Sequence, residues 1–151
     1  QNDMTLTVIG LVISIHILGM FAFSPAVGWL CDRFGRVAVI RLGVGVLTLA
    51  AVTAGTASGM AEVQLGCGLF LLGFGWSCTL IAGSTLLSES VSDDVRSSTQ
   101  GTSDLIMNLM GAGGGAVAGL IIGLLNYHWL CGLALVPVAL LGAGTLVVSR
   151  R

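Results

Sequence analysis

Five long apolar runs, separated by short polar stretches, organise this chain of 151 residues. A helix needs about 20 apolar residues to cross the hydrocarbon core of a membrane, and each run is of that order. Backbone groups in lipid must be paired within the protein, so each run predicts a helix rather than an open strand. The predicted spans are 4–30, 37–59, 63–87, 93–125 and 129–148. We therefore predict an all-α membrane protein in which residues 1–151 form a single transmembrane helical bundle.

The fourth span is predicted to begin before its apolar run, at Ser92-Asp93-Asp94. A serine hydroxyl can cap the first turn of a helix, and acids are favourable at the positive end of the helix dipole. Polar residues at every fourth position would then share one face. They are Arg96, Gln100, Asp104 and Asn108. At about 1.5 Å per residue, Asp104 would lie roughly 15 Å beyond the cap.

Glycines at every fourth position form a second face of the same predicted helix. They are Gly111, Gly115, Gly119 and Gly123. Small residues at this spacing allow the backbones of two membrane helices to approach closely. We therefore expect this glycine ladder to be a helix-packing surface.

Composition supports a membrane protein and excludes several other classes. Hydrophobic residues make up 55% of the chain and charged residues only 9%, whereas a soluble domain carries about a quarter charged residues. No basic patch with interleaved aromatic residues is present, so we predict no nucleic-acid partner. The four cysteines form no C-x-x-C pair and have no histidine at ligand spacing, so we predict no metal site and no cofactor.

The arginines predict the orientation of the chain. The six basic residues are all arginines, and they flank the first and third connections or form the tail: Arg33, Arg36, Arg41, Arg96, Arg150 and Arg151. The second and fourth connections, near Glu62 and at 126–128, hold no basic residue. Because basic residues favour the cytoplasmic side, we expect the amino end outside and the carboxyl end in the cytoplasm.

A charged loop between the first two spans carries the most specific motif, Gly28-Trp29-Leu30-Cys31-Asp32-Arg33-Phe34-Gly35-Arg36. The pattern G-x-x-x-D-R-x-G-R resembles the loop signature of the major facilitator superfamily (MFS) of secondary transporters. One departure follows at Val37, where many members carry a further Lys or Arg. Weaker resemblances to bacterial members lie in 16–21, 73–76 and 100–104.

The resemblance implies a fold of twelve spans in two halves of six, with both termini inside. Five spans that start outside and end inside fit helices eight to twelve, in the carboxyl half, and helices two to six are the alternative. The chain would be a fragment of a multi-pass transporter in the bacterial cytoplasmic, or inner, membrane. Its partners would be the lipid bilayer, a small-molecule substrate, protons and the missing N-terminal half. The implied activity is alternating access, as a proton-coupled exporter or antiporter.

The resemblance also implies a role for the charged loop as a cytoplasmic gate. The residues concerned are Gly28, Asp32, Arg33, Gly35 and Arg36, with Glu89 from the end of the third span as a local partner. An arginine fork can bind a carboxylate through two parallel hydrogen bonds. The alternative is a membrane anchor with a solvated ion pair, which would contribute about 0–1 kcal/mol.

Two further places are candidates for cavity lining or proton coupling. His16 lies midway along the first span, where an ionisable group usually faces a cavity, and histidine titrates near neutral pH. The alternative is a neutral imidazole bonded to a neighbouring helix. Asp104, with Gln100 and Asn108, could line the cavity, or could close the cytoplasmic end of its helix.

Two other classes of protein compete with the transporter. An intramembrane enzyme is disfavoured, because no G-x-S-x-G, no H-E-x-x-H and no paired intramembrane acids occur. We therefore predict no enzyme and no catalytic residue. A non-transporting membrane assembly module, built on the glycine ladder, remains as the alternative.

Overall fold

The computed structural model describes residues 2–56, 61–125 and 127–148. It contains α1 (Asn2–Phe21), α2 (Ser24–Phe34), α3 (Arg36–Gly55), α4 (Ala61–Glu89), α5 (Asp93–Leu124) and α6 (Tyr127–Val148). Five segments of the described chain are long and apolar enough to cross a membrane, and no strand occurs in these ranges. The predicted all-α membrane fold with five spans is therefore confirmed. Residues 57–59 of the second predicted span, Asn126 and the tail residues Arg150 and Arg151 lie outside the described residues.

The first span is divided into two helices, which the apolar run alone did not predict. α1 ends at Phe21, and α2 begins at Ser24 after a turn. Pro25 lies in the first turn of α2; it has no backbone N–H and disfavours helical geometry in the residue before it. The Ser24 hydroxyl donates to the Met20 carbonyl oxygen at 3.4 Å and so bridges the break.

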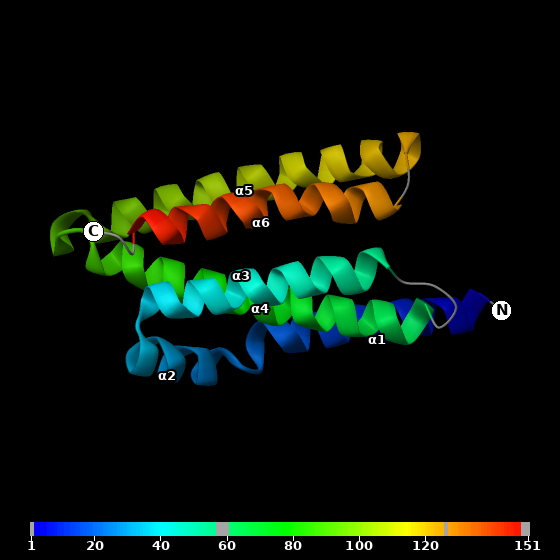
Figure 1. Ribbon diagram of the computed structural model, residues 1–151, viewed down its shortest axis with the longest axis horizontal. Helices are drawn as coiled ribbons and strands as arrows, with labels where there is room; N and C mark the ends of the chain where they lie inside the picture. The colour runs from blue at the N-terminus through cyan, green and yellow to red at the C-terminus, as the bar shows by residue number, and fades with distance from the viewer. Residues whose placement is uncertain (1, 57–60, 126, 149–151) are drawn as a thin grey trace.

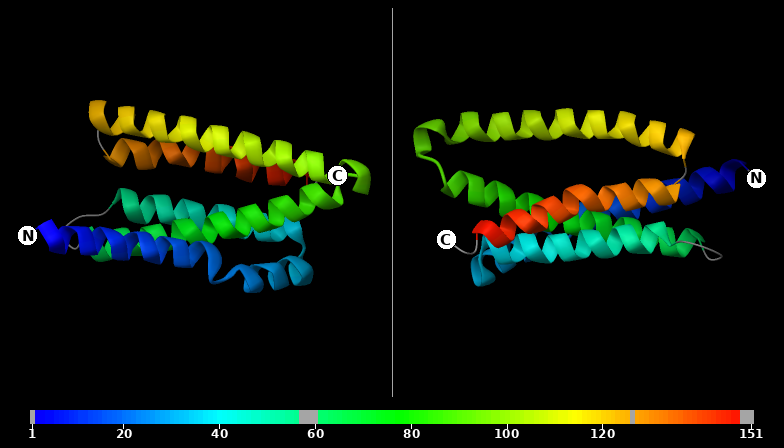
Figure 2. Two further views of the ribbon diagram at one scale, coloured as in Figure 1. Left: turned by 180° about the vertical axis from the view of Figure 1, so that it is seen from behind. Right: turned by 45° about the horizontal axis from the view of Figure 1, so that its top comes forward.

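The helices run along a common long axis (Figure 1). α5 and α6 lie side by side along one edge of the bundle, and α1 and α2 lie along the other, with α3 and α4 between them (Figures 1 and 2). α2 ends at the same end of the bundle at which α3 and α5 begin (Figure 1). We call this the arginine end, because Arg33, Arg36 and Arg96 lie in those turns.

α4 is the central helix, and glycines bring its neighbours close. It packs along α3 on one side and α1 on the other. A Cβ atom on Gly73 would overlap the His16 carbonyl oxygen of α1, and one on Gly19 would lie 2.6 Å from the Phe70 carbonyl oxygen. Gly43 of α3 likewise faces the side chain of Thr79 at 2.6 Å. Glycine is required at positions 19 and 73 because backbone of the facing helix occupies the space that a side chain would need, and at Gly43 the Thr79 side chain occupies it.

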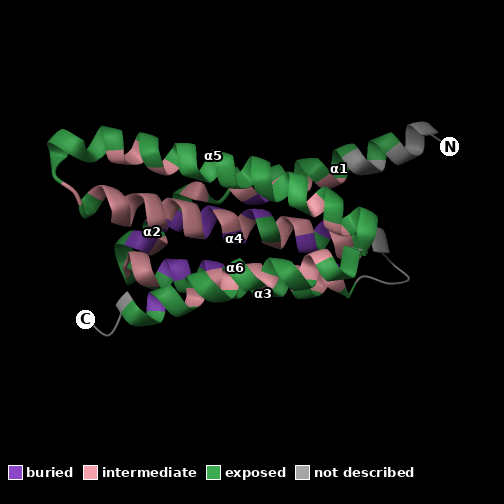
Figure 3. Ribbon diagram, turned by 90° about the horizontal axis from the view of Figure 1, so that it is seen from above, coloured by how far each residue is buried: buried purple, intermediate pink, exposed green. Residues whose placement is uncertain are grey.

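The buried core lies between α2, α3 and α4. It consists of Val27, Cys31, Val39, Ile40, Cys78 and Ala82. No described residue of α5 is buried, and Figure 3 shows exposed residues along most of that helix. The bundle is thus closely packed around α4, whereas α5 rests lightly on it.

The start of α5 differs in one detail from the prediction. Ser92 precedes the first residue of the helix, Asp93, and has extended backbone angles. Its hydroxyl makes no side-chain capping bond to the helix, so the predicted serine cap is wrong. The acids Asp93 and Asp94 do lie in the first turn, where the helix dipole favours them.

Candidate functional site

The charged loop is a one-residue connection between two helices. α2 ends at Phe34, Gly35 has a φ of 86°, and α3 begins at Arg36. Only glycine adopts this left-handed φ at little steric cost, so the second glycine of the motif sets the reversal of the chain. Gly28, the first glycine, has no atom within 4 Å of the position where a Cβ would lie. No described residue therefore packs closely against the first glycine.

Arg36 joins the loop to the end of α4. Its Nη2 donates to Glu89 Oε1 at 2.6 Å, and its Nη1 donates to the Cys31 carbonyl oxygen at 2.9 Å. The Asp32 carboxylate is farther away, at 3.4 Å. The Arg36 side chain is only 25% exposed, and its Nε is buried without a partner among the described residues. The guanidinium is therefore held in one orientation by two elements.

The outer surface of the loop is open. The Asp32 side chain is 76% exposed, and Arg33 is exposed. An exposed ion pair contributes only about 0–1 kcal/mol, so Asp32 adds little to the hold of Arg36 on α4. Its carboxylate and the Arg33 guanidinium are accessible to a group from outside residues 1–151.

His16 of α1 contacts the backbone of α4. Its Nδ1 lies 2.8 Å from the Leu69 carbonyl oxygen. A carbonyl oxygen only accepts hydrogen bonds, so Nδ1 carries the hydrogen and donates. In the neutral ring, Nε2 is then the acceptor and the atom that takes up a proton. Gly73 allows this approach because it has no Cβ atom, so its backbone can lie against the His16 carbonyl oxygen.

The polar face of α5 is fixed at its arginine end. Arg96 pairs with Asp93 at 2.6 Å and donates to the Ser88 carbonyl oxygen at 3.0 Å. The Gln100 amide donates to the Ser84 hydroxyl at 2.9 Å and to the Ser88 hydroxyl at 2.5 Å. Sequence analysis missed Ser84 and Ser88, although their spacing of four residues places them on one face of α4.

Farther along α5, the same face is open. Asp104 and Asn108 are both exposed, and Asn108 Nδ2 donates to the Asp104 carbonyl oxygen at 2.7 Å. Asp104 has no ion pair with any residue that the structure describes. The described contacts thus bring Gln100 to α4 but do not bring Asp104 to His16.

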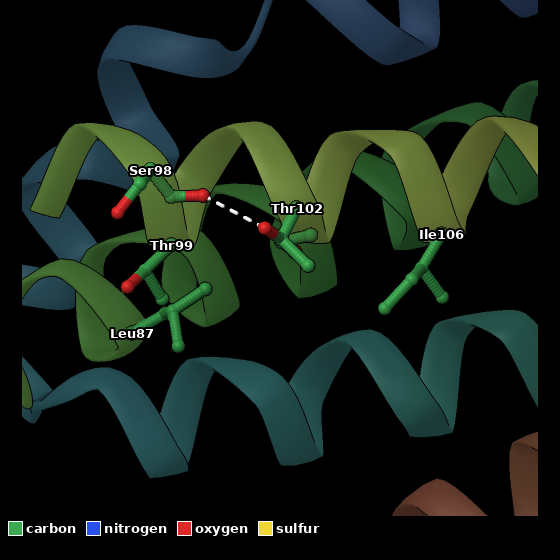
Figure 4. Close-up of a pocket in the computed structure, with 6 residues that line it drawn as sticks. Leu87, Ser98, Thr99, Thr102 and Ile106 are labelled. Atoms are coloured by element: carbon green, nitrogen blue, oxygen red, sulfur yellow. Dashed lines mark hydrogen bonds between the residues drawn. The ribbon is translucent and has the colours of Figure 1, made fainter. Parts of the chain in front are cut away.

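A pocket of about 430 Å³ lies between α4 and the first turns of α5. Its lining is Leu87, Ser98, Thr99, Thr102, Ser103 and Ile106. Figure 4 shows Leu87 facing these α5 side chains, and the Thr102 hydroxyl donates to the Ser98 carbonyl oxygen at 2.9 Å. The lining is apolar and hydroxyl-bearing, without a charged group, so the pocket suits an uncharged part of a ligand.

The glycine ladder of α5 makes no close contact within the described part of the chain. Nothing lies within 4 Å of the Cβ positions of its members, Gly111, Gly115, Gly119 and Gly123. The expected packing is therefore not provided by the described residues, and it stays a prediction. Among the described side chains, no group of three His, Cys, Asp or Glu residues could hold a metal ion.

Comparison with known proteins agrees with this arrangement of helices and charged loop. The chain matches the Major Facilitator Superfamily family model over residues 1–151. It is 42% identical over 114 residues to the uncharacterized MFS-type transporter YdeG of Bacillus subtilis. The aligned residues cover 76% of this chain and 26% of that protein. It is 37% identical over 122 residues to the uncharacterized MFS-type transporter YddS of the same organism, covering 81% of this chain and 28% of that one.

A further relative has a named solute. The chain is 32% identical over 93 residues to the cis,cis-muconate transport protein of Acinetobacter baylyi, covering 62% of this chain and 22% of that protein. No solved structure matches the chain. The chain spans 26% and 28% of the lengths of the two Bacillus relatives. It is a multi-pass membrane protein. Because the family model matches residues 1–151 and two MFS-type transporters are 42% and 37% identical to it, the chain belongs to the major facilitator superfamily.

Proposed function

We propose that the full-length protein is a secondary active transporter that exports a small organic solute in exchange for protons. Residues 1–151 would supply helices eight to twelve, and the N-terminal half would complete the cavity. The observation that carries this proposal is the charged loop, in which Arg36 ties the α2–α3 reversal to Glu89 of α4 at 2.6 Å. Three helices would thereby move as one unit in alternating access, which requires rigid-body rocking of one half against the other.

The loop would act as the inner gate. The arginine end would lie on the cytoplasmic side of the plasma membrane, because basic residues such as Arg33, Arg36 and Arg96 favour that side. Asp32 and Arg33 are exposed on the loop, so they would pair with the other half when the gate is closed. Arg36 would hold the loop on α4 in both states, because its contacts with Glu89 and the Cys31 carbonyl lie within this half.

His16 would carry the proton, together with the open acid Asp104. Its Nδ1 is committed to the Leu69 carbonyl oxygen, which leaves Nε2 to gain and lose the proton. A histidine within a membrane span can exist neutral, so this costs less than a permanent charge. Gln100 and Asn108 would line the path beside Asp104 on the polar face of α5.

The solute class is supported by the pocket and by one relative. The pocket between α4 and α5 has a volume of about 430 Å³ and an apolar, hydroxyl-bearing lining, which fits a small organic molecule. The Acinetobacter relative is named for the transport of cis,cis-muconate, which is a small organic solute.

The test is proton-coupled transport by the full-length protein in proteoliposomes with an imposed pH gradient. Internal pH is recorded while a panel of small organic cations, sugars and acids is added, for the wild type, Glu89→Gln and Asp93→Asn. We expect solute-dependent proton movement that falls about tenfold or more in Glu89→Gln, because the bond between the loop and α4 loses its charge. Asp93→Asn is the matched control, since Asp93 is 87% exposed and pairs only within its own helix.

The outcomes separate the candidate functions. Proton movement that persists in Glu89→Gln would keep the transporter and reduce the loop to an anchor. No solute-linked flux across the whole panel would favour a non-transporting assembly module, for which the open glycine ladder of α5 is the observation in favour.

A further inference from the structure

One face of α4 connects three features that lie apart in the sequence. Leu69 accepts the His16 hydrogen bond, Trp76 contacts Phe21, and Leu87 lines the pocket beside α5. Residues 69 and 87 are separated by five turns of a helix, at about 3.6 residues per turn, and residue 76 lies about two turns from the first. The Cα atoms of these three residues therefore lie on the same side of α4; the contact with His16 is made by the Leu69 backbone carbonyl, and the Leu69 side chain lines a different pocket with residues of α3 and α6. This side leads from the middle of the first span towards the arginine end.

The aromatic residues at the break of the first span divide between two sides of α4. Phe23 contacts Phe70 and Phe74 at centroid distances of 5.9 and 5.6 Å. Phe21 contacts Trp76 at 6.5 Å, with the planes inclined by 68°. Phe70 and Phe74 lie one turn apart on α4, and Trp76 lies on a different face. Phe23 thus contacts two aromatic rings of α4, whereas Phe21 contacts one, that of Trp76.

The Phe21–Trp76 pair is available to a ligand. Phe21 is 60% exposed, and Trp76 is only partly buried. In an edge-to-face pair the edge of one ring meets the face of the other, so the remaining faces are free to stack on a third ring. His16 precedes Phe21 by five residues on α1, about 7.5 Å along the helix, and its Nε2 is left for a ligand because Nδ1 contacts the Leu69 carbonyl oxygen.

The depth of Trp76 does not fit the usual role of a membrane tryptophan. Tryptophans gather at the membrane surface, where one edge is apolar and the other meets water. Trp129 is two residues from the start of α6, and Trp29 is five from the end of α2, which suits that role. Trp76 is thirteen residues from the end of α4, or about 20 Å along the helix, within a core about 30 Å thick.

The segments of α4 and α1 beside the aromatic pair have no fixed charge. Residues 69–87 of α4 contain no Asp, Glu, Lys or Arg, and His16 is the one ionisable residue in 10–21 of α1. The pocket at Leu87 is likewise lined by apolar and hydroxyl side chains. An ionised solute would lose its hydration here without gaining a counter-charge from these segments. A neutral solute with one hydrogen-bonding group would fit both the rings and His16.

We propose that Phe21 and Trp76 form an aromatic subsite that selects neutral, planar aromatic solutes bearing a hydroxyl or similar polar group. The ring system stacks on Phe21 and Trp76, and the polar group bonds to Nε2 of His16. This rests on the proposed transport function, because it names the class of solute that the transporter carries.

The test compares two probes with the same carbon skeleton and hydroxyl group, one planar and aromatic and the other saturated. Saturable binding of radiolabelled 2-naphthalenemethanol to the purified full-length protein is measured first. Its displacement by the same unlabelled compound is then compared with its displacement by the fully saturated decahydro analogue. Both probes are neutral and carry one hydroxyl, so a difference reports on ring stacking. We expect the saturated analogue to displace at least about tenfold more weakly. Equal displacement by the two probes, or no saturable binding, would overturn the proposal.

Matched variants locate the site. Phe21→Leu and Trp76→Leu should weaken binding about tenfold, and Trp76→Phe should restore most of it because the ring is kept. Phe23→Leu is the control, since it removes a ring from the same break but on the other side of α4. Because Phe21 is exposed, its replacement should leave the thermal unfolding midpoint unchanged. A loss in Phe23→Leu as large as in Phe21→Leu would contradict the assignment.

Failure of this proposal can be told apart from failure of the transport function. The same protein is reconstituted and its solute-linked proton movement is measured with the mixed panel and with 2-naphthalenemethanol. Proton movement with other solutes, without binding of the aromatic probe, would refute the aromatic subsite and keep the transporter. Ring-selective binding without flux of any solute would keep the subsite and refute transport.

Discussion

The glycines of α4 and the glycine ladder of α5 have opposite surroundings. On α4, Gly73 and Gly75 face backbone or side-chain atoms of α1 and α3 at distances that exclude a Cβ atom. On α5, Gly111 and Gly115 have no described atom within 4 Å of their Cβ positions. The comparison shows that a small-residue face permits close packing without guaranteeing a partner. Within this chain the close packing is concentrated on α4.

The polar contacts follow the same division. Around α4 they cross between helices, as in the bond from Arg36 to Glu89 and the bond from His16 to Leu69. Among the described contacts of α5, those that cross to α4 lie near its start, through Arg96 and Gln100, and farther on the Asn108 amide bonds within its own helix. The described contacts therefore tie α1 and α3 to α4, and α5 is attached to α4 at the arginine end.

The largest effect on this comparison should come from Gly73→Ala. The new methyl group would overlap the His16 carbonyl oxygen, which is backbone and cannot rotate away. We expect the full-length protein to lose about 1–3 kcal/mol of stability, as is typical of overpacking, measured by unfolding in mixed micelles. Gly83→Ala is the control on the same helix, because Gly83 has open space. Equal stability of the two variants would mean that α1 and α4 are not in close contact.

The next largest effect should come from Gln100→Ala, which tests the attachment of α5. Its amide bonds to Ser84 and Ser88 of α4, and hydrogen bonds between membrane helices contribute about 0.6 kcal/mol each on average. We expect a loss of about 1 kcal/mol in the same unfolding measurement. Asn108→Ala should cost less, because that amide bonds only within α5. The reverse order would place the attachment of α5 farther along the helix.

Asp32→Asn should have a smaller effect on stability. Its carboxylate is 76% exposed and 3.4 Å from Arg36, so we expect a loss of at most about 1 kcal/mol. The loss should shrink as salt is raised, because exposed charges are screened. A larger loss that salt does not change would indicate that a group outside residues 1–151 buries this carboxylate.

The smallest effect should come from Gly115→Ala. No described atom is near the new methyl group, and alanine is a better helix former than glycine by about 1 kcal/mol in water. We expect a change in the stability of the full-length protein of less than about 1 kcal/mol in either direction. A loss as large as that of Gly73→Ala would break the comparison, because it would show that a helix outside residues 1–151 covers the ladder.

The number of spans and the place of the charged loop between the first two of them were predictable from the amino-acid sequence. These are local properties: the length of an apolar run predicts a helix, and a glycine between two helices predicts the reversal at Gly35. The sequence also suggested Glu89 as a local partner of the loop, because both lie at the same expected membrane surface. The break before Pro25 had a local signal too, since proline disfavours helical geometry in the residue before it.

Only the tertiary structure decided which faces meet. The four-residue spacing indicates that Gly111, Gly115 and the other glycines of the ladder share a face. It does not indicate whether another helix covers that face. In the structure, Gly19 of α1 and Gly73 of α4 lie at the close contact between these two helices. His16 lies against the Leu69 carbonyl oxygen, and Phe21 contacts Trp76. The physical reason is that these spans are apolar on every side, so hydrophobic periodicity does not mark the packed face. That choice depends on the fit of one backbone against another.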